Sequence, residues 1–281
     1  MNNIAHLICS KNFSGIEQHV HELTSTLTNN SDYCLYIFAD KTLEPHFQNQ
    51  RFQIFPNKFR FNLFALFKLR KLIKDHKIQI LHCHGSKSIL LGRWVSWITK
   101  VELIATVHAN KKRPVATNGF RKTIVVNELL KKTYPAAEVI GNWVNPKLEI
   151  LNSSRDGNFI AVGRLEKIKR FDLLIHAWKG IDEKLEIIGD GLEKNNLLAI
   201  IKDNNLADQI TIRSEVNSQE LGNIYRRAKG LIITSSRVGG PRVALEAAAF
   251  NLPVFGTNVG IMGELFPQEV LADPNLSLIH I

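Results

Sequence analysis

The stretch "FIAVGRLEKIKRFDLLIHAW" (159–178) decides the fold class of this chain. An apolar run typical of a buried strand ends in a glycine, and a basic loop then leads into an amphipathic helical pattern. The same order of strand, loop and helix recurs along the whole sequence. Buried strands that alternate with helices form βαβ units with a parallel sheet. The sequence therefore predicts an α/β fold.

The predicted elements fall into two groups. Strands are predicted at 4–9, 33–39, 78–83, 102–107, 159–163, 185–189, 230–235 and 252–257. Helical patterns lie at 15–28, 61–76, 170–179, 193–203, 218–228 and 241–250. A polar, turn-rich stretch separates the two groups, so we predict two Rossmann-like domains at 1–147 and 158–275 with a linker at 148–157.

The second predicted domain is short for a doubly wound sheet. After the strand at 252–257 the chain ends where further helices would close such a domain. We therefore expect a C-terminally truncated second domain. The last residues, 276–281 ("LSLIHI"), are apolar for an exposed tail, and we expect them to be non-native.

Composition excludes several classes of protein. At 44% hydrophobic and 22% charged residues the chain is neither disordered nor fibrous. The longest strongly apolar run, 89–99, is about half a membrane span and contains Arg93. The N-terminus lacks a basic region and a cleavage site of the secretory type. Three sparse cysteines (Cys9, Cys34 and Cys83) fit buried thiols in a reducing compartment, so we expect a cytoplasmic protein.

Charge is distributed unevenly between the two halves. Residues 1–150 carry 21 Lys+Arg against 10 Asp+Glu, whereas residues 151–281 carry 15 against 16. An asymmetry of this kind predicts that the first domain meets an anionic partner. The segment 58–77 combines Phe64 and Phe67 with several lysines, which fits either a helix on an anionic membrane or a surface helix with its apolar stripe in the core. No nucleic-acid-binding motif accompanies it.

Candidate ligand-binding residues follow the predicted strands. Gly163-Arg164 and Lys169 come after the strand at 159–163, and two cations at the carboxyl end of a strand suit a diphosphate. Gly189-Asp190-Gly191 makes a tight turn after the next strand. Ser14-Gly15 precedes a helix whose first N–H groups favour an anion.

One further pattern resembles a ligand-binding loop. Gly239-Gly240-Pro241 would let backbone N–H groups approach a ligand, and Glu246 follows on a helix, where its carboxylate can accept two ribose hydroxyls.

Together these patterns resemble the retaining glycosyltransferases of the GT-B fold, family 4 (glycosyltransferase group 1), of the lipopolysaccharide and polysaccharide biosynthesis type. The resemblance covers the chain up to about residue 275. It rests on Ser14-Gly15-Ile16-Glu17, His82-Cys83-His84, Thr106-Val107-His108, Asn142-Trp143-Val144, Gly163-Arg164 with Lys169, and Val238-Gly239-Gly240-Pro241 with Glu246-Ala247. No single motif is decisive, but their order across two domains is specific.

The resemblance implies two Rossmann-like domains that face each other across a cleft, the first for the acceptor and the second for the nucleotide sugar. It implies a hexosyl-type transferase (EC 2.4) that needs no metal and no cofactor beyond its UDP- or GDP-linked donor. Catalytic roles fall to His108, Arg164 and Lys169. The donor site would comprise Gly15, Gly163, Arg164, Lys169, Gly189, Gly191, Gly239, Gly240 and Glu246. The substrate-binding residues would be Glu17, His84, His108 and Asn142.

Val238 departs from the family pattern, which has a glutamate that orients the donor sugar. Valine can neither donate nor accept a hydrogen bond, at a cost of about 1–3 kcal/mol. A different donor sugar, an impaired enzyme and a sequence error remain open; we favour the first.

His82-Cys83-His84 has the spacing of a metal site. Alternate strand residues share a face, but the sequence offers no third and fourth ligand with matching spacing. We therefore favour a pair that lines a pocket and predict no metal ligands.

The resemblance and the charge lead to one functional hypothesis and two alternatives. The hypothesis is transfer of a sugar to a lipid-linked or polysaccharide acceptor in cell-envelope synthesis, in the cytoplasm or peripherally on the inner face of the cytoplasmic membrane. The alternatives are a GT-B sugar-nucleotide epimerase and an inactive sugar-nucleotide-binding pseudo-transferase.

Overall fold

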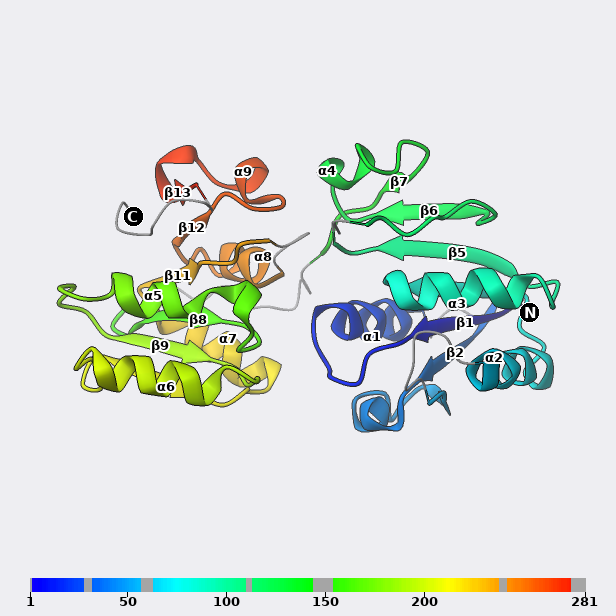
Figure 1. The fold of residues 1–281 in the computed structure, drawn as a ribbon, viewed down its shortest axis with the longest axis horizontal. Coiled ribbons are helices and arrows are strands. Elements are labelled where there is room, and N and C mark those ends of the chain that lie inside the picture. The colour runs from blue at the N-terminus through cyan, green and yellow to red at the C-terminus, as the bar shows by residue number, and fades with distance from the viewer. Residues whose placement is uncertain are drawn as a thin grey trace. The chain divides into compact units, whose positions relative to one another are not determined.

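The computed structural model describes residues 2–27, 32–56, 63–109, 113–143, 154–237 and 242–273. The chain divides into two compact units, Met1–Asn142 and Trp143–Ile281 (Figure 1). Most of the predicted linker, up to residue 153, and the tail at 276–281 lie outside the described residues. Arg155, from the end of the predicted linker, belongs structurally to unit 2, because its guanidinium donates to the carbonyls of Ala228, Phe250 and Asn251.

Unit 1 is built on a parallel sheet with the strand order β3-β2-β1-β4-β5-β6-β7. Its strands are β1 (Asn2–Ile8), β2 (Tyr33–Ala39), β3 (Arg51–Ile54), β4 (Ile80–His84), β5 (Glu102–Val107), β6 (Lys122–Val125) and β7 (Glu138–Val139). Its helices are α1 (Gly15–Leu27), η1 (Lys41–His46), α2 (Leu63–Asp75), α3 (Ser86–Ser96) and α4 (Glu128–Lys131). The strand order reverses direction between β1 and β4, where open α/β sheets bind ligands.

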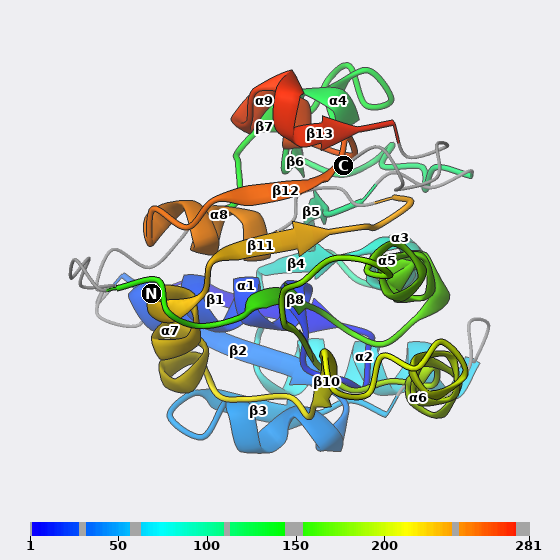
Figure 2. The same cartoon turned by 90° about the vertical axis from the view of Figure 1, so that its left-hand side faces the viewer.

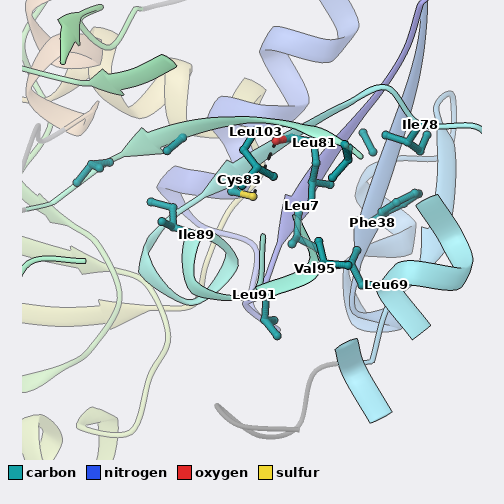
Figure 3. Packing of buried hydrophobic residues seen from close by; sticks show 14 of the residues in the cluster. Leu7, Phe38, Leu69, Ile78, Leu81, Cys83, Ile89, Leu91, Val95 and Leu103 are labelled. Carbon is teal, nitrogen blue, oxygen red and sulfur yellow. Dashed lines mark hydrogen bonds between the residues drawn. The ribbon is translucent and has the colours of Figure 1, made fainter. Parts of the chain in front are cut away.

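The two faces of this sheet differ. Leu7, Leu81 and Cys83 point to one face and form a core with α2 and α3, through residues such as Leu69, Ile89 and Val95 (Figure 3). Ile8 and Ile37 point to the other face and pack against Val20 of α1. Because side chains alternate along a strand, His6 lies on the α1 side of the sheet.

Unit 2 is a smaller sheet of the same kind, with the order β10-β9-β8-β11-β12-β13. Its strands are β8 (Phe159–Val162), β9 (Leu185–Ile188), β10 (Ile210–Arg213), β11 (Gly230–Ile233), β12 (Val254–Thr257) and β13 (Leu271–Ala272). Its helices are η2 (Lys167–Lys169), α5 (Phe171–Ala177), α6 (Lys194–Asp203), α7 (Ser218–Arg227), α8 (Arg242–Ala249), α9 (Met262–Leu265) and η3 (Gln268–Val270). Every registered strand pair in both units is parallel.

The core of unit 2 also has two layers. Helices α5 and α6 cover one face of the sheet, whereas α7, α8 and α9 cover the other (Figure 2). Here the order reverses between β8 and β11, so the loops after these two strands form the expected ligand-binding edge.

The predicted α/β architecture with two Rossmann-like halves is confirmed. Strands β3, β6, β7, β10 and β13 and helices α3, α4 and α9 were not predicted. The missed strands are edge or near-edge strands of two to four residues, too short to show a hydrophobic period. Among the described residues, no helix is both long and apolar enough to cross a bilayer.

Candidate active site

The basic residues of unit 2 lie at the carboxyl end of β8. Gly163 follows the strand with a φ of 154°, a conformation that favours glycine. The Lys169 side chain folds back over it, since a Cβ on Gly163 would lie 3.4 Å from the Lys169 Nζ. The Arg164 guanidinium forms an ion pair of 2.8 Å with Glu166. The predicted diphosphate pair is thus gathered within one short loop.

The environment of Lys169 opposes its charge. Burial lowers the pKa of the Lys169 ammonium, the nearby Arg164 lowers it further, and Glu166 raises it. Two like charges held together gain stability when an anion binds between or beside them. The pair is therefore suited to the anion that the sequence predicts here.

The loop that carries Lys169 is fixed to the neighbouring strand β11. The Thr234 hydroxyl donates to the Lys169 carbonyl at 2.7 Å, and the Ser236 N–H donates to the Ile168 carbonyl at 3.0 Å. These bonds join the two strands that flank the reversal of strand order. The backbone at Lys169 is therefore fixed by hydrogen bonds from the end of β11. A side chain on a fixed backbone would lose less entropy when it binds a ligand.

At Gly189 and Gly191 the backbone packs too closely against a neighbouring loop to leave room for a side chain. A Cβ on Gly189 would overlap the Gly163 carbonyl, and one on Gly191 would overlap the Leu165 carbonyl. Asp190 between them accepts from the Glu215 N–H at 3.0 Å and from Lys194 at 2.9 Å. The tight turn lets the loop after β9 pack directly on the loop after β8, so these glycines shape the loop that carries Arg164.

Glu246 lies on α8 with its carboxylate already oriented. The Tyr225 hydroxyl of α7 donates to one carboxylate oxygen at 3.0 Å, and the Arg242 Nε lies 4.0 Å from the other. Tyr225 is buried, and burial together with Glu246 raises its pKa well above the usual range. The phenol therefore remains a donor. Val238, Gly239, Gly240 and Pro241 lie outside the described residues.

In unit 1, Gly15 is the first residue of α1, directly after the loop from β1. Glu17 is buried and accepts from the Ser14 N–H at 2.9 Å, the Ser14 hydroxyl at 2.7 Å and the Ser10 hydroxyl. A carboxylate three residues after a serine that accepts the serine N–H is half of a capping box. The carboxylate thus secures the start of α1, the helix to which the anion contact of Gly15 is assigned by resemblance.

The predicted substrate residues His84 and His108 meet in the structure. His84 ends β4 and His108 follows β5, the adjacent strand, and their Nδ1 and Nε2 atoms lie 3.4 Å apart. His84 is buried, whereas His108 is half-buried. Asn142 is the last residue of unit 1 and is half-buried. It does not belong to the group of histidines around His84.

Three further histidines surround this pair. His6 on β1 faces His82 in register and its Nδ1 lies 3.0 Å from the His84 Nε2. His82 contacts the Thr106 hydroxyl at 2.7 Å. His19 of α1 packs edge-on against His108, with ring centroids 4.8 Å apart. The sequence around His82 and His84 revealed no third metal ligand, because the other histidines come from strands and a helix that are far away in the sequence.

Burial favours the neutral form of His6, His82 and His84. It lowers the pKa of His6 to about 3, with a smaller contribution from His19. It also lowers the pKa of His82 and of His84 well below the usual value, with the neighbouring histidines adding to the effect. Each neutral ring keeps one lone pair and one N–H.

Two family models together match nearly the whole chain. The model for glycosyl transferases group 1 matches residues 148–277, and that for glycosyltransferase family 4 matches residues 13–140. The chain belongs to the glycosyltransferases, with a family 4 match in unit 1 and a group 1 match in unit 2.

Individual relatives agree with this assignment. An uncharacterized glycosyltransferase of Methanocaldococcus jannaschii is 28% identical over 279 residues, covering 89% of this chain and 77% of its own. The amylovoran biosynthesis glycosyltransferase AmsD of Erwinia amylovora is 26% identical over 294 residues, covering 92% of this chain and 81% of its own.

Solved structures share the fold of this glycosyltransferase. HepE of Anabaena in complex with UDP and glucose superposes with a TM-score of 0.83 at 17% identity, covering 99% of this chain and 87% of HepE. The lipopolysaccharide outer core galactosyltransferase WaaB gives 0.74 at 17% identity, covering 98% of this chain and 87% of WaaB. At such identity the likeness concerns the fold alone.

Sequence reasoning missed several residues that shape the site of this transferase. Tyr225 and Thr234 act through hydrogen bonds to residues distant in sequence, which no local motif contains. Two surface hollows lie elsewhere, one lined by Asn2, Lys74 and Arg121 and the other by Asp156, Arg213 and Arg227.

Proposed function

We propose that this glycosyltransferase moves a hexose from a nucleotide-sugar donor to a lipid-linked or polysaccharide acceptor with retention of configuration. The proposed setting is synthesis of a cell-envelope glycan such as lipopolysaccharide. The observation that carries the proposal is the gathering of Arg164 and Lys169 at the carboxyl end of β8, where Lys169 is packed over Gly163 and, among the described residues, only Glu166 offsets the two positive charges.

The donor is proposed to bind through its diphosphate and its ribose. Arg164 and Lys169 would take the diphosphate, and Glu246, oriented by Tyr225, would accept the ribose hydroxyls. HepE, which shares the fold, was solved with UDP and glucose and with UDP-glucose, which supports a UDP-linked donor as the first to test.

Catalysis would rest on stabilising the leaving diphosphate. Charge develops on its oxygens as the glycosidic bond breaks, and preorganised cations stabilise that charge. The leaving phosphate would take the proton of the acceptor hydroxyl, so the proposal needs neither a protein nucleophile nor a metal ion. His108 would contact the transferred sugar.

A thermal-shift panel of UDP-, GDP- and ADP-sugars tests the donor site, because a ligand that binds the folded state stabilises it by mass action. We expect one nucleotide class to raise the Tm and the Arg164→Ala variant to lose that shift. If no nucleotide sugar stabilises the wild-type chain, the proposed donor site is wrong.

Two alternative functions have distinct products. An epimerase would convert the sugar of the donor without any acceptor, whereas the transferase turns over only when an acceptor is present. A pseudo-transferase would bind the donor and release nothing, and Val238 is the residue that favours it. Activity that exists only in the Val238→Glu variant would support that reading, whereas turnover with Val238 in place would reject it.

We propose that the acceptor is presented at an anionic surface, with α2 as a peripheral contact on the inner face of the membrane. Ala65, Leu69 and Ile73 bury the core-facing stripe of α2, yet Phe64 and Phe67 are 65% and 58% exposed. Lys71 and Lys74 are also exposed, one and two turns further along. Exposed aromatic rings beside lysines suit an anionic bilayer.

Sedimentation with vesicles of phosphatidylglycerol at low salt tests this contact. We expect the Phe67→Ser and Lys71→Glu variants to bind less than the wild type, while Lys202→Glu, at the end of α6 in unit 2, serves as the matched control. Equal binding of all three variants would exclude α2 as the contact.

A further inference from the structure

The histidine cluster of unit 1 contains five rings, of which only His84 and His108 are assigned to substrate binding. His6, His19, His82, His84 and His108 come from β1, α1, β4 and the end of β5, and all but His108 are buried. Neutral imidazole is the commonest metal ligand in proteins. The cluster divides into two groups of three whose ligand atoms lie within 4.8 Å of one another: His6 with His82 and His84, and His19 with His84 and His108.

The second group has the better geometry for an ion. Zinc is bound by nitrogen at about 2.0–2.1 Å, so two nitrogens of a tetrahedral site lie about 3.3 Å apart. The His84 Nδ1 and the His108 Nε2 already lie 3.4 Å apart. His19 reaches them from α1, and its ring packs edge-on against His108. Its ligand nitrogen lies within 4.8 Å of the other two.

In this site His6 does not bind the metal ion but holds the ring of its ligand His84. Its Nδ1 lies 3.0 Å from the His84 Nε2, so an N–H on that Nε2 can donate to His6. This tautomer leaves the lone pair of the His84 Nδ1 directed at His108. Metal-binding histidines commonly donate their other N–H to such a partner, which fixes the ring and its tautomer.

The first group is a poorer site. All three of its rings are buried, and His82 is engaged with the Thr106 hydroxyl at 2.7 Å. In the second group, half-buried His108 gives access from solvent and leaves a fourth position for water or another ligand. Three protein ligands and one open position are the pattern of an accessible zinc site.

We propose that His19, His84 and His108 bind one divalent transition-metal ion of the zinc, cobalt or nickel class, with His6 as the residue that positions His84. Imidazole ligands suit these ions, whereas Mg²⁺ and Ca²⁺ prefer oxygen ligands.

Titration of the metal-free full chain with Co²⁺ tests this site without an activity assay. We expect one Co²⁺ per chain with the visible absorption of tetrahedral cobalt, displacement by Zn²⁺, and no displacement by Mg²⁺. His108→Gln and His84→Gln should abolish the spectrum, and His6→Gln should weaken Co²⁺ binding about 10–100-fold.

Controls separate this site from other histidines and from unfolding. His176→Gln, on the exposed face of α5 in unit 2, should bind Co²⁺ like the wild type. Circular dichroism and the Tm report whether each variant is folded, and half-buried His108 is the variant expected to keep the fold. Absence of a tetrahedral spectrum in the wild type overturns the proposal. The proposal is also overturned if the tetrahedral spectrum is lost in the His82→Gln variant but retained in the folded His108→Gln variant.

One consequence rests on the proposed function. Because a bound ion would occupy the nitrogen of His108, Zn²⁺ should inhibit sugar transfer at about the concentration at which it displaces Co²⁺. Inhibition that tracks binding supports the shared residue. Binding without inhibition would remove His108 from the proposed transfer mechanism and leave the metal site standing.

Discussion

At the scale of single residues, Lys169 is the side chain on which the proposed donor binding depends most directly. Its ammonium lies over Gly163 beside Arg164, and burial lowers its pKa. Charge-assisted hydrogen bonds contribute about 1.5–3 kcal/mol. We expect Lys169→Met to weaken binding of the donor nucleotide about 10–100-fold, as measured by isothermal titration calorimetry.

The matched control for this variant is Lys167→Met, which removes an exposed lysine from the same turn. It changes the net charge equally but leaves the anion site intact. Equal losses of affinity in the two variants would mean that overall charge, and not the placement of Lys169, attracts the donor.

Tyr225 is a positioning residue for Glu246. Its hydroxyl donates to the carboxylate at 3.0 Å, and a net hydrogen bond of this kind contributes about 1 kcal/mol. We expect Tyr225→Phe to weaken nucleotide binding about fivefold, with the ring still filling the core. Glu246→Gln in the Tyr225→Phe background should add less than it does alone, because the two residues act on one contact. Strictly additive effects would contradict this coupling.

At the scale of elements, the packing of α3 on β4 depends on one glycine. A Cβ on Gly92 would overlap the Cys83 sulfur, although Ala is otherwise the better helix former by about 1 kcal/mol. Overpacking costs about 1–3 kcal/mol, so we expect Gly92→Ala to lower the free energy of unfolding. Urea unfolding measures it, and the added Cys83→Ala change should restore part of the loss.

Gly222 of α7 provides the comparison. A Cβ there would lie 3.5 Å from Phe250 Cζ, an ordinary contact. Gly222→Ala should therefore be neutral or stabilising by up to about 1 kcal/mol. If Gly92→Ala is also neutral or stabilising, a methyl group fits between α3 and Cys83, which would contradict the structure.

Helix α2 illustrates how far an element can be read from the sequence. Its existence was predicted from the pattern at 61–76, within two residues of its bounds. The pattern left open whether Phe64 and Phe67 face a membrane or the core, and in the structure the buried residues of α2 are Ala65, Leu69 and Ile73. Only packing against the sheet decides which of two apolar stripes faces the core.

At the scale of the whole molecule, the two units differ in their response to acid. His6, His82 and His84 of unit 1 have lowered pKa values, that of His6 about 3, against 6.5 when unfolded. The unfolded state therefore takes up protons first as the pH falls. Their stabilising effect is full above pH 6.5 and is lost progressively below it, by about 1.4 kcal/mol per pH unit for each proton taken up.

Unit 2 carries no buried histidine among its described residues. The lowered pKa values of Asp156 and Asp190 affect it only below their ordinary value of 3.8. We therefore expect that, between pH 6.5 and 4, acid destabilises unit 1 selectively, as measured by hydrogen exchange of β1 and β4 against β8 and β9 in metal-free buffer. Faster loss of protection in unit 2 would contradict this assignment.

The sequence by itself determined the α/β class, most of the longer elements and the place of Gly163, Arg164 and Lys169 at the end of a strand. These signals are local, because a strand, its glycine turn and the cations after it lie within about ten residues, as in Gly163, Arg164 and Lys169. Only the tertiary structure decided the partners: Tyr225 for Glu246, Thr234 for the loop of Lys169, and four histidines around His84. The physical reason is that parallel sheets join strands distant in sequence, so side chains that meet at one edge share no spacing along the chain.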